Sequence, residues 1–160
     1  MSHSAVVAEA AGKLAAALLA RDERIAVAES CTGGLIAAAC TELAGSSRWF
    51  ERGVVTYSNE AKQQLLGVPG ALIAAHGAVS EAVVRAMAEG LMVRAPVHHT
   101  LAVSGIAGPE GGSAEKPVGT VWIAWAAAGG TRARRFQFSG DRTAVRQQAV
   151  LAAVLGLLER

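Results

Sequence analysis

Short β-type runs alternate with helical segments along the first two thirds of the chain, and this alternation limits the possible folds more than any other feature. The runs are Arg24–Ala28 (RIAVA), Gly53–Tyr57 (GVVTY) and Thr100–Ser104 (TLAVS). Their β-branched and small apolar residues are typical of strands. The segments between them are long enough for helices, so the strands are expected to be joined by helical crossovers.

A different pattern follows in the last third of the sequence. Val118–Ala127 and Thr131–Phe138 are two β-type runs joined by Gly129-Gly130, which is a hairpin signal. Helical crossovers followed by a hairpin predict a mixed sheet, with helices packed on both of its faces. We therefore predict an α/β fold, a three-layer α/β/α arrangement with a mixed sheet, formed by a single domain over residues 1–160.

The composition excludes several classes of protein. Hydrophobic residues make up 52% and charged residues 18% of the 160 residues, which argues against disorder. A net charge of +2 is too small to indicate a nucleic-acid partner. The cluster of Arg132, Arg134 and Arg135 has strand-like alternation, which favours a solvated edge.

The cysteines, histidines and apolar segments indicate no metal and no membrane. Cys31 and Cys40 are the two cysteines, too few for a disulfide framework. The His98–His99 pair has no carboxylate or cysteine at ligand spacing. No uninterrupted apolar segment reaches membrane-spanning length. We expect a cytoplasmic protein without metal, membrane or nucleic-acid partner.

A polar loop follows the first predicted strand. It consists of Ser30-Cys31-Thr32-Gly33-Gly34 and leads into an alanine-rich helical segment. A strand-to-helix turn presents free backbone N–H groups to an anion or a developing oxyanion. The alternative is that Ser30 or Thr32 only caps the helix, and the local pattern leaves both interpretations open.

A second strand-to-helix transition contains Tyr57 and Lys62. Lys13, Lys62 and Lys116 are the only lysines among 15 basic residues. A lysine can lose its proton when buried, whereas an arginine cannot, so only lysine can serve as a general base. A surface position on the helix is the alternative for Lys62.

The third feature is a glycine-rich loop from Gly105 to Pro117 after the third predicted strand. Such a loop suits a substrate that approaches the backbone closely. It contains neither a P-loop nor a dinucleotide fingerprint. A flexible excursion without function is an equally good interpretation.

The three features occur in order in a sequence that resembles the CinA C-terminal family. The resemblance is carried by AESCTGGLIAAACTELAGSSRWFERGVVTYSNEAKQQLLGV (Ala28 to Val68) and GAVS (Gly77 to Ser80). It continues in VSGIAGPEGGSAEKPVGTVWIAWA (Val103 to Ala126) and GDR (Gly140 to Arg142). Only about the first twenty residues carry no signature.

The resemblance implies an activity and a site. Members of that family hydrolyse the carboxamide of nicotinamide mononucleotide to nicotinate mononucleotide and ammonia, and full-length relatives carry a further N-terminal domain. In family terms Ser30 matches the nucleophile, and Tyr57 and Lys62 match the residues that assist it. No cofactor is implied, the partner is a small-molecule nucleotide substrate, and we expect a homo-oligomer, with a dimer favoured. The competing class is a non-catalytic nucleotide-binding or competence-related regulatory module.

A Ser–Lys mechanism fits these residues. Lys62 would take the proton of Ser30, directly or through Tyr57, and the helix-start N–H groups would bind the oxyanion. Cys31 is the rival nucleophile, because a helix N-terminus activates a thiolate. The phosphate is expected on the Gly105–Gly108 loop with Lys116 or Arg142. The predicted substrate-binding residues are Cys31, Thr32, Gly33, Gly34, Gly105, Ala107, Gly108, Lys116 and Arg142.

Overall fold

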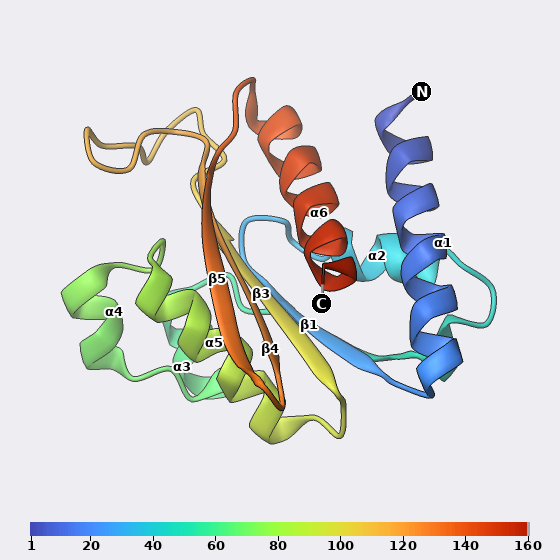
Figure 1. Cartoon of the computed structure of the whole chain (residues 1–160). Coiled ribbons are helices and arrows are strands. Elements are labelled where there is room, and N and C mark those ends of the chain that lie inside the picture. The colour runs from blue at the N-terminus through green and yellow to red at the C-terminus, as the bar shows by residue number, and fades with distance from the viewer. Residues whose placement is uncertain (160) are drawn as a thin grey trace.

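The computed structural model describes residues 1–159 and contains one open five-stranded sheet with the order β2-β1-β3-β4-β5 (Figure 1). β1 pairs in parallel with β2 and with β3, and the β3–β4 and β4–β5 pairs are antiparallel. The bounds are β1 Ile25–Glu29, β2 Phe50–Val55, β3 His99–Gly105, β4 Thr120–Ala127 and β5 Gly130–Gln137. The sheet is mixed, as predicted.

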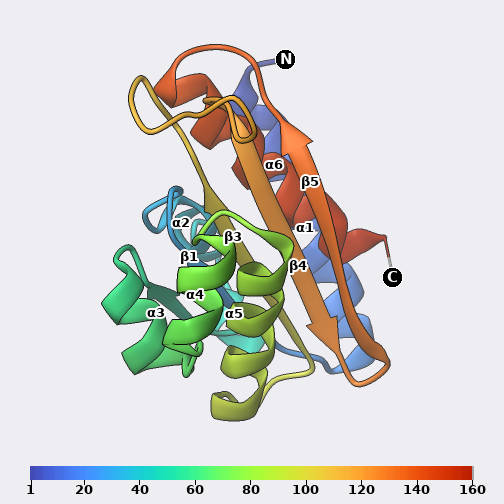
Figure 2. The same cartoon turned by 90° about the vertical axis from the view of Figure 1, so that its left-hand side faces the viewer.

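Helices cover both faces of the sheet (Figures 1 and 2). One layer contains α1, α2 and α6, and the opposite layer contains α3, α4 and α5. The predicted α/β/α architecture is therefore confirmed. The helices are α1 His3–Arg21, α2 Leu35–Thr41, α3 Asn59–Leu66, α4 Gly70–His76, α5 Glu81–Arg94 and α6 Arg142–Leu158, with a 3-10 turn at Ser46–Arg48.

The two faces of the sheet carry side chains of different size. Alternate strand residues point to opposite faces, and the face toward α1, α2 and α6 has large residues such as Leu101, Ile123 and Trp125. The face toward α5 presents buried alanines, among them Ala28 and Ala124. Small side chains on this face allow α5 to approach the strands closely.

The parallel register aligns the carboxyl ends of the first strands. Glu29, the last residue of β1, pairs with Val55 of β2 and with Val103 of β3. The residues that follow β1 and β2 therefore leave the same edge of the sheet side by side. β2 starts and ends earlier than the predicted Gly53–Tyr57 strand, because Thr56 and Tyr57 already turn toward α3.

Within residues 1–159, one helix, α1, is long and apolar enough to cross a membrane when judged by length and composition alone. Its apolar residues Val7, Leu14 and Leu18 are buried, and the helix packs against α6 and α2. In this structure α1 lies in the outer helical layer, with one apolar face packed against its neighbours. The cytoplasmic location remains a prediction.

A close helix contact gives a test of the packing. Gly90 of α5 lies against the end of α3, where an added Cβ would overlap the carbonyl oxygen of Leu66. A backbone carbonyl cannot rotate away, so we expect Gly90→Ala to lower the free energy of unfolding by about 1–3 kcal/mol. Gly12 of α1 has open space around the same position, and Gly12→Ala should raise stability by up to about 1 kcal/mol. Urea unfolding of both variants measures the difference, and equal effects would contradict the close contact.

Candidate active site

The edge formed by the ends of β1 and β2 brings Ser30 and Lys62 together. Ser30 follows β1 directly, and Lys62 is on α3, which starts after the N-cap Ser58. The Oγ of Ser58 accepts a hydrogen bond from the amide of Ala61 at 3.0 Å, so Ser58 is a structural cap. The Nζ of Lys62 lies 3.1 Å from the Oγ of Ser30. The two side chains predicted as base and nucleophile are in direct contact.

The amine of Lys62 is surrounded by oxygen atoms. Besides Ser30, it contacts the carbonyl oxygens of Thr56 at 2.8 Å and Tyr57 at 3.0 Å. A neutral amine has two N–H donors for the two carbonyls and one lone pair, which can accept the Ser30 hydroxyl proton. The Ser30 hydroxyl also lies 3.4 Å from the carbonyl oxygen of Tyr57, to which it can donate instead. The three oxygens therefore accommodate both the ammonium and a neutral amine whose lone pair faces Ser30.

Burial changes the proton affinity of this amine. Lys62 is 1% exposed, and burial lowers its pKa from the usual value of about 10.5, while Cys31 acts weakly in the opposite direction. No carboxylate contacts the amine within the described residues. A lysine with a lowered pKa can act as a general base nearer to neutral pH.

The loop after Ser30 departs from the expected geometry in one respect. The first-turn amides of α2, at Ile36 and Ala37, donate to the carboxylate of Glu29 at 2.9 and 3.0 Å. These helix-start groups are occupied and cannot bind an oxyanion. In the part of the chain that the structure describes, the amides of Cys31, Thr32 and Gly34 donate no hydrogen bond to an oxygen atom. They are the available donors beside Ser30.

Arg146 of α6 holds the same loop from the other side. Its Nε donates to the carbonyl of Cys31 at 3.0 Å, and its second contact is the carbonyl of Thr32 at 3.5 Å. The C=O and N–H of a trans peptide point in opposite directions. The bond to the Cys31 carbonyl therefore turns the Thr32 N–H away from Arg146.

Cys31 is a poor candidate for the nucleophile. Burial raises the pKa of its thiol to about 11, and the neighbouring Glu29 charge adds to the effect. Its sulfur packs near Gly105, where an added Cβ would also meet the Val121 side chain. Cys31 and Gly105 fill space below the site, while Gly33 and Gly34 take positive φ angles of 57° and 103° in the turn.

Tyr57 contributes to the site in an unexpected way. Its carbonyl, and not its hydroxyl, contacts Lys62. The hydroxyl accepts a hydrogen bond from Arg142 at 3.2 Å, and the ring is exposed. Arg142 also donates to the carbonyl of Gly108 at 2.8 Å. This geometry favours direct proton transfer between Ser30 and Lys62 over a relay through Tyr57.

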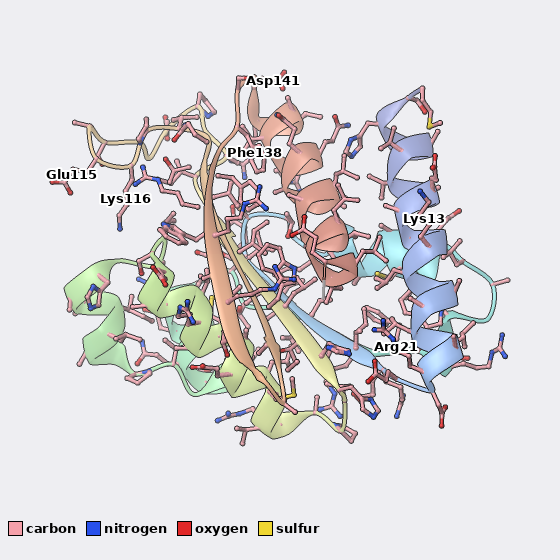
Figure 3. All side chains as sticks on the ribbon, viewed as in Figure 1. Lys13, Arg21, Glu115, Lys116, Phe138 and Asp141 are labelled. Atoms are coloured by element: carbon pink, nitrogen blue, oxygen red, sulfur yellow. The ribbon has the colours of Figure 1, made fainter. Side chains whose placement is uncertain are left out.

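The remaining predicted residues divide into two groups. Ala107 and Arg142 line a cavity of about 440 Å³ at the start of α6. Lys116 instead donates to the carbonyl of His76 at the end of α4, at 2.7 Å. Figure 3 shows Lys116 above α4, away from Asp141 at the start of α6. The structure thus brings Arg142, Tyr57 and Gly108 together, but not Lys116.

Sequence reasoning missed Glu29 and Arg146. An acidic residue just before a helix-start loop is a signal that could have found Glu29, because carboxylates are favoured at helix N-termini. Arg146 had no such signal. Within residues 1–159 no group of three or more His, Cys, Asp or Glu side chains is placed to hold a metal ion.

Comparison with known proteins places the chain among close relatives. Residues 7–160 match the CinA C-terminal domain. The chain is 56% identical over 145 residues to "Nicotinamide-nucleotide amidohydrolase PncC" of Escherichia coli strain K12, covering 90% of this chain and 88% of that protein. It is 53% identical over 139 residues to a "CinA-like protein" of Anaeromyxobacter dehalogenans, covering 87% of this chain and 34% of that longer protein.

A solved structure has the same fold. It is the crystal structure of the competence damage-inducible protein A from Klebsiella pneumoniae, which is 44% identical in sequence to this chain. The TM-score is 0.93, and the match covers 96% of both chains. The arrangement of strands and helices described above is therefore shared with this relative.

The lowered pKa of Lys62 predicts a pH-dependent stability. The unfolded chain binds the lysine proton up to about pH 10.5, whereas the folded chain releases it at a lower pH. Stability from this residue should therefore rise with pH between the folded pKa and about 10.5, and be lost as pH falls through that window. Lys62→Met removes the effect. The free energy of unfolding of wild type minus that of the variant should therefore become more positive as pH rises. Urea unfolding at several pH values tests this, and a pH-independent difference would contradict it.

Proposed function

The chain belongs to the CinA C-terminal domain family, and from this membership and the Ser30–Lys62 contact we propose that it hydrolyses the carboxamide of nicotinamide mononucleotide. The products are nicotinate mononucleotide and ammonia. Relatives bearing the name nicotinamide-nucleotide amidohydrolase share more than half of their aligned residues with this chain. The chain is accordingly an amidohydrolase that acts on a linear amide.

The observation that carries the mechanism is the 3.1 Å contact between the Lys62 amine and the Ser30 hydroxyl. The neutral amine takes the hydroxyl proton as the Ser30 oxygen forms a bond to the carboxamide carbon. The carbonyl π electrons move to oxygen, giving a tetrahedral oxyanion. The protonated amine keeps its hydrogen bonds to the carbonyls of Thr56 and Tyr57.

The oxyanion binds to the free amides of the nucleophile loop in this proposal. The N–H groups of Cys31, Thr32 and Gly34 are the donors beside Ser30, and the loop is held by Glu29 and Arg146. Preorganised donors of this kind stabilise charge as it develops, because no reorganisation is needed during the reaction.

Lys62 then returns its proton to the leaving nitrogen. The C–N bond breaks, ammonia departs and the acyl group remains on Ser30. A water molecule attacks the acyl carbon and gives its proton to the neutral Lys62, which passes it to the Ser30 oxygen as the ester bond breaks. The nicotinic acid group is released and gives its remaining proton to solvent, where ammonia takes it up as ammonium. The product is then the nicotinate carboxylate, the starting protonation states of Ser30 and Lys62 are restored, and atoms and charges balance.

We place the nucleotide phosphate near Arg142. This guanidinium lies at the start of α6 and lines the 440 Å³ cavity with Ala107 and Thr143. Its bonds to Tyr57 and Gly108 connect the cavity to the segment after β2, where the carbonyl of Tyr57 contacts the Lys62 amine. Arg142 is preferred over Lys116, whose amine contacts the end of α4.

Removal of the nucleophile tests the proposed reaction. Wild type should release ammonia from nicotinamide mononucleotide, with free nicotinamide as the substrate control. Ser30→Ala should lose nearly all turnover while still binding the nucleotide, because only the attacking oxygen is absent. Cys31→Ala should keep most of its activity, since its thiol is protonated and buried. An inactive Cys31→Ala together with an active Ser30→Ala would reverse the assignment, and wild-type binding without turnover would favour the non-catalytic module.

Replacement of the base separates proton transfer from charge. Lys62→Arg keeps a cation of similar length but cannot accept a proton. We expect turnover to fall by roughly a hundred- to ten-thousand-fold, as for Lys62→Ala. Product affinity should survive better in the Arg variant, which retains positive charge. Steady-state rates and product titrations of folded variants measure both effects, and near wild-type turnover in Lys62→Arg would exclude lysine as the base.

A further inference from the structure

Glu29 is a buried carboxylate directly before the nucleophile. It is 1% exposed, and its two oxygens accept hydrogen bonds from the amides of Ile36 and Ala37. Within residues 1–159 no basic side chain forms an ion pair with it. A buried charge needs compensation, and here the amides and the positive end of a helix supply it.

The position of this carboxylate ties the whole nucleophile loop together. α2 begins after Gly34, which has φ 103° and no side chain to cap the helix. Glu29, at the end of β1, takes the place of the missing cap: its carboxylate reaches across the Ser30 loop to the first turn of α2. The strand end, the Ser30 loop and the first turn of α2 are thereby joined by two hydrogen bonds of 2.9 and 3.0 Å.

This contact also decides which amides remain free. Glu29 occupies Ile36 and Ala37, and the Gly33 amide donates to the carbonyl of Ser30. The amides of Cys31, Thr32 and Gly34 are left without a hydrogen bond to oxygen within the described chain. The donors for an oxyanion are therefore located in the turn beside Ser30, and not at the end of α2.

We propose that Glu29 is a positioning residue for amide hydrolysis, which fixes the Ser30 loop so that its free amides meet the oxyanion. The inference rests on the proposed function. It differs from a purely structural cap, because a cap affects stability alone, whereas a positioning residue affects the chemical step in protein that is fully folded. A misplacement of about 1 Å at a reacting centre costs on the order of a hundredfold in rate.

Glu29→Gln is the decisive variant. The glutamine amide has the same shape, but only its oxygen can accept, and its NH₂ group faces the second helix amide. We expect kcat for nicotinamide mononucleotide to fall roughly ten- to a hundredfold, with KM unchanged because the nucleotide contacts near Arg142 are intact.

Two further variants separate positioning from stability. Cys40→Ala, in the buried face of α2, should lower the thermal midpoint by leaving a cavity but keep wild-type kcat below that midpoint. Glu29→Asp keeps the charge but is one methylene shorter. If Glu29→Gln does not fold, reduced kcat with unchanged KM in Glu29→Asp supports the proposal.

The outcomes are distinguishable from failure of the proposed reaction. If wild type releases no ammonia from nicotinamide mononucleotide, the proposed function fails. If wild type is active and the folded Glu29 variant has wild-type kcat, Glu29 is only a helix cap and the inference is overturned. An equal loss of kcat in Cys40→Ala would also overturn it.

Discussion

The burial of the Lys62 amine among three oxygen atoms is the interaction on which the site depends. A charged ammonium loses much of its hydration when buried, and no carboxylate contacts this one within the described residues. Burial without a carboxylate favours the neutral form, whose two hydrogens can meet the two carbonyls while its lone pair faces the Ser30 oxygen. In the proposed mechanism, the absence of a carboxylate partner is therefore what lets this lysine serve as a base.

The parallel pairing of β1 and β2 is what makes this contact possible. Glu29 and Val55 are in register, so the next residues of both strands leave the sheet together. The carbonyls of Thr56 and Tyr57 reach the amine from the end of β2, while Ser30 reaches it from the end of β1. α3 starts immediately afterwards and returns Lys62 over these ends. A sheet with β1 and β2 antiparallel would have placed the two segments at opposite edges.

Local patterns were sufficient for the fold class. For Ser30 and Lys62 they left structural alternatives open, and the family resemblance singled out the two residues that the structure brings into contact. Strand and helix periodicities are local, and the scarcity of lysine in an arginine-rich chain draws attention to Lys62. The contact of Arg146 with the Ser30 loop joins residues 115 positions apart, and no local pattern encodes it. Lys116 lies in a motif that suggested a phosphate contact. In the structure its amine instead contacts the carbonyl of His76 at the end of α4.

The helix-start amides illustrate a third limit of sequence reasoning. A strand, a glycine-rich turn and a helix indicate free N–H groups, but the pattern does not say which groups the protein itself uses. Glu29 belongs to the strand by its pairing and to the helix by its hydrogen bonds. Only the three-dimensional arrangement shows that the donors of α2 are already occupied.

One environment accounts for the roles of all three reactive side chains at the site. Burial disfavours charge of either sign, so it lowers the pKa of Lys62 and raises the pKa of Cys31 to about 11. The same burial that favours a neutral lysine therefore keeps the neighbouring thiol protonated. In the proposed mechanism Ser30 does not need to ionise before it attacks, because its proton passes to Lys62 as the new bond forms. A site that suppresses charge therefore favours the proposed serine nucleophile over the cysteine beside it in the loop.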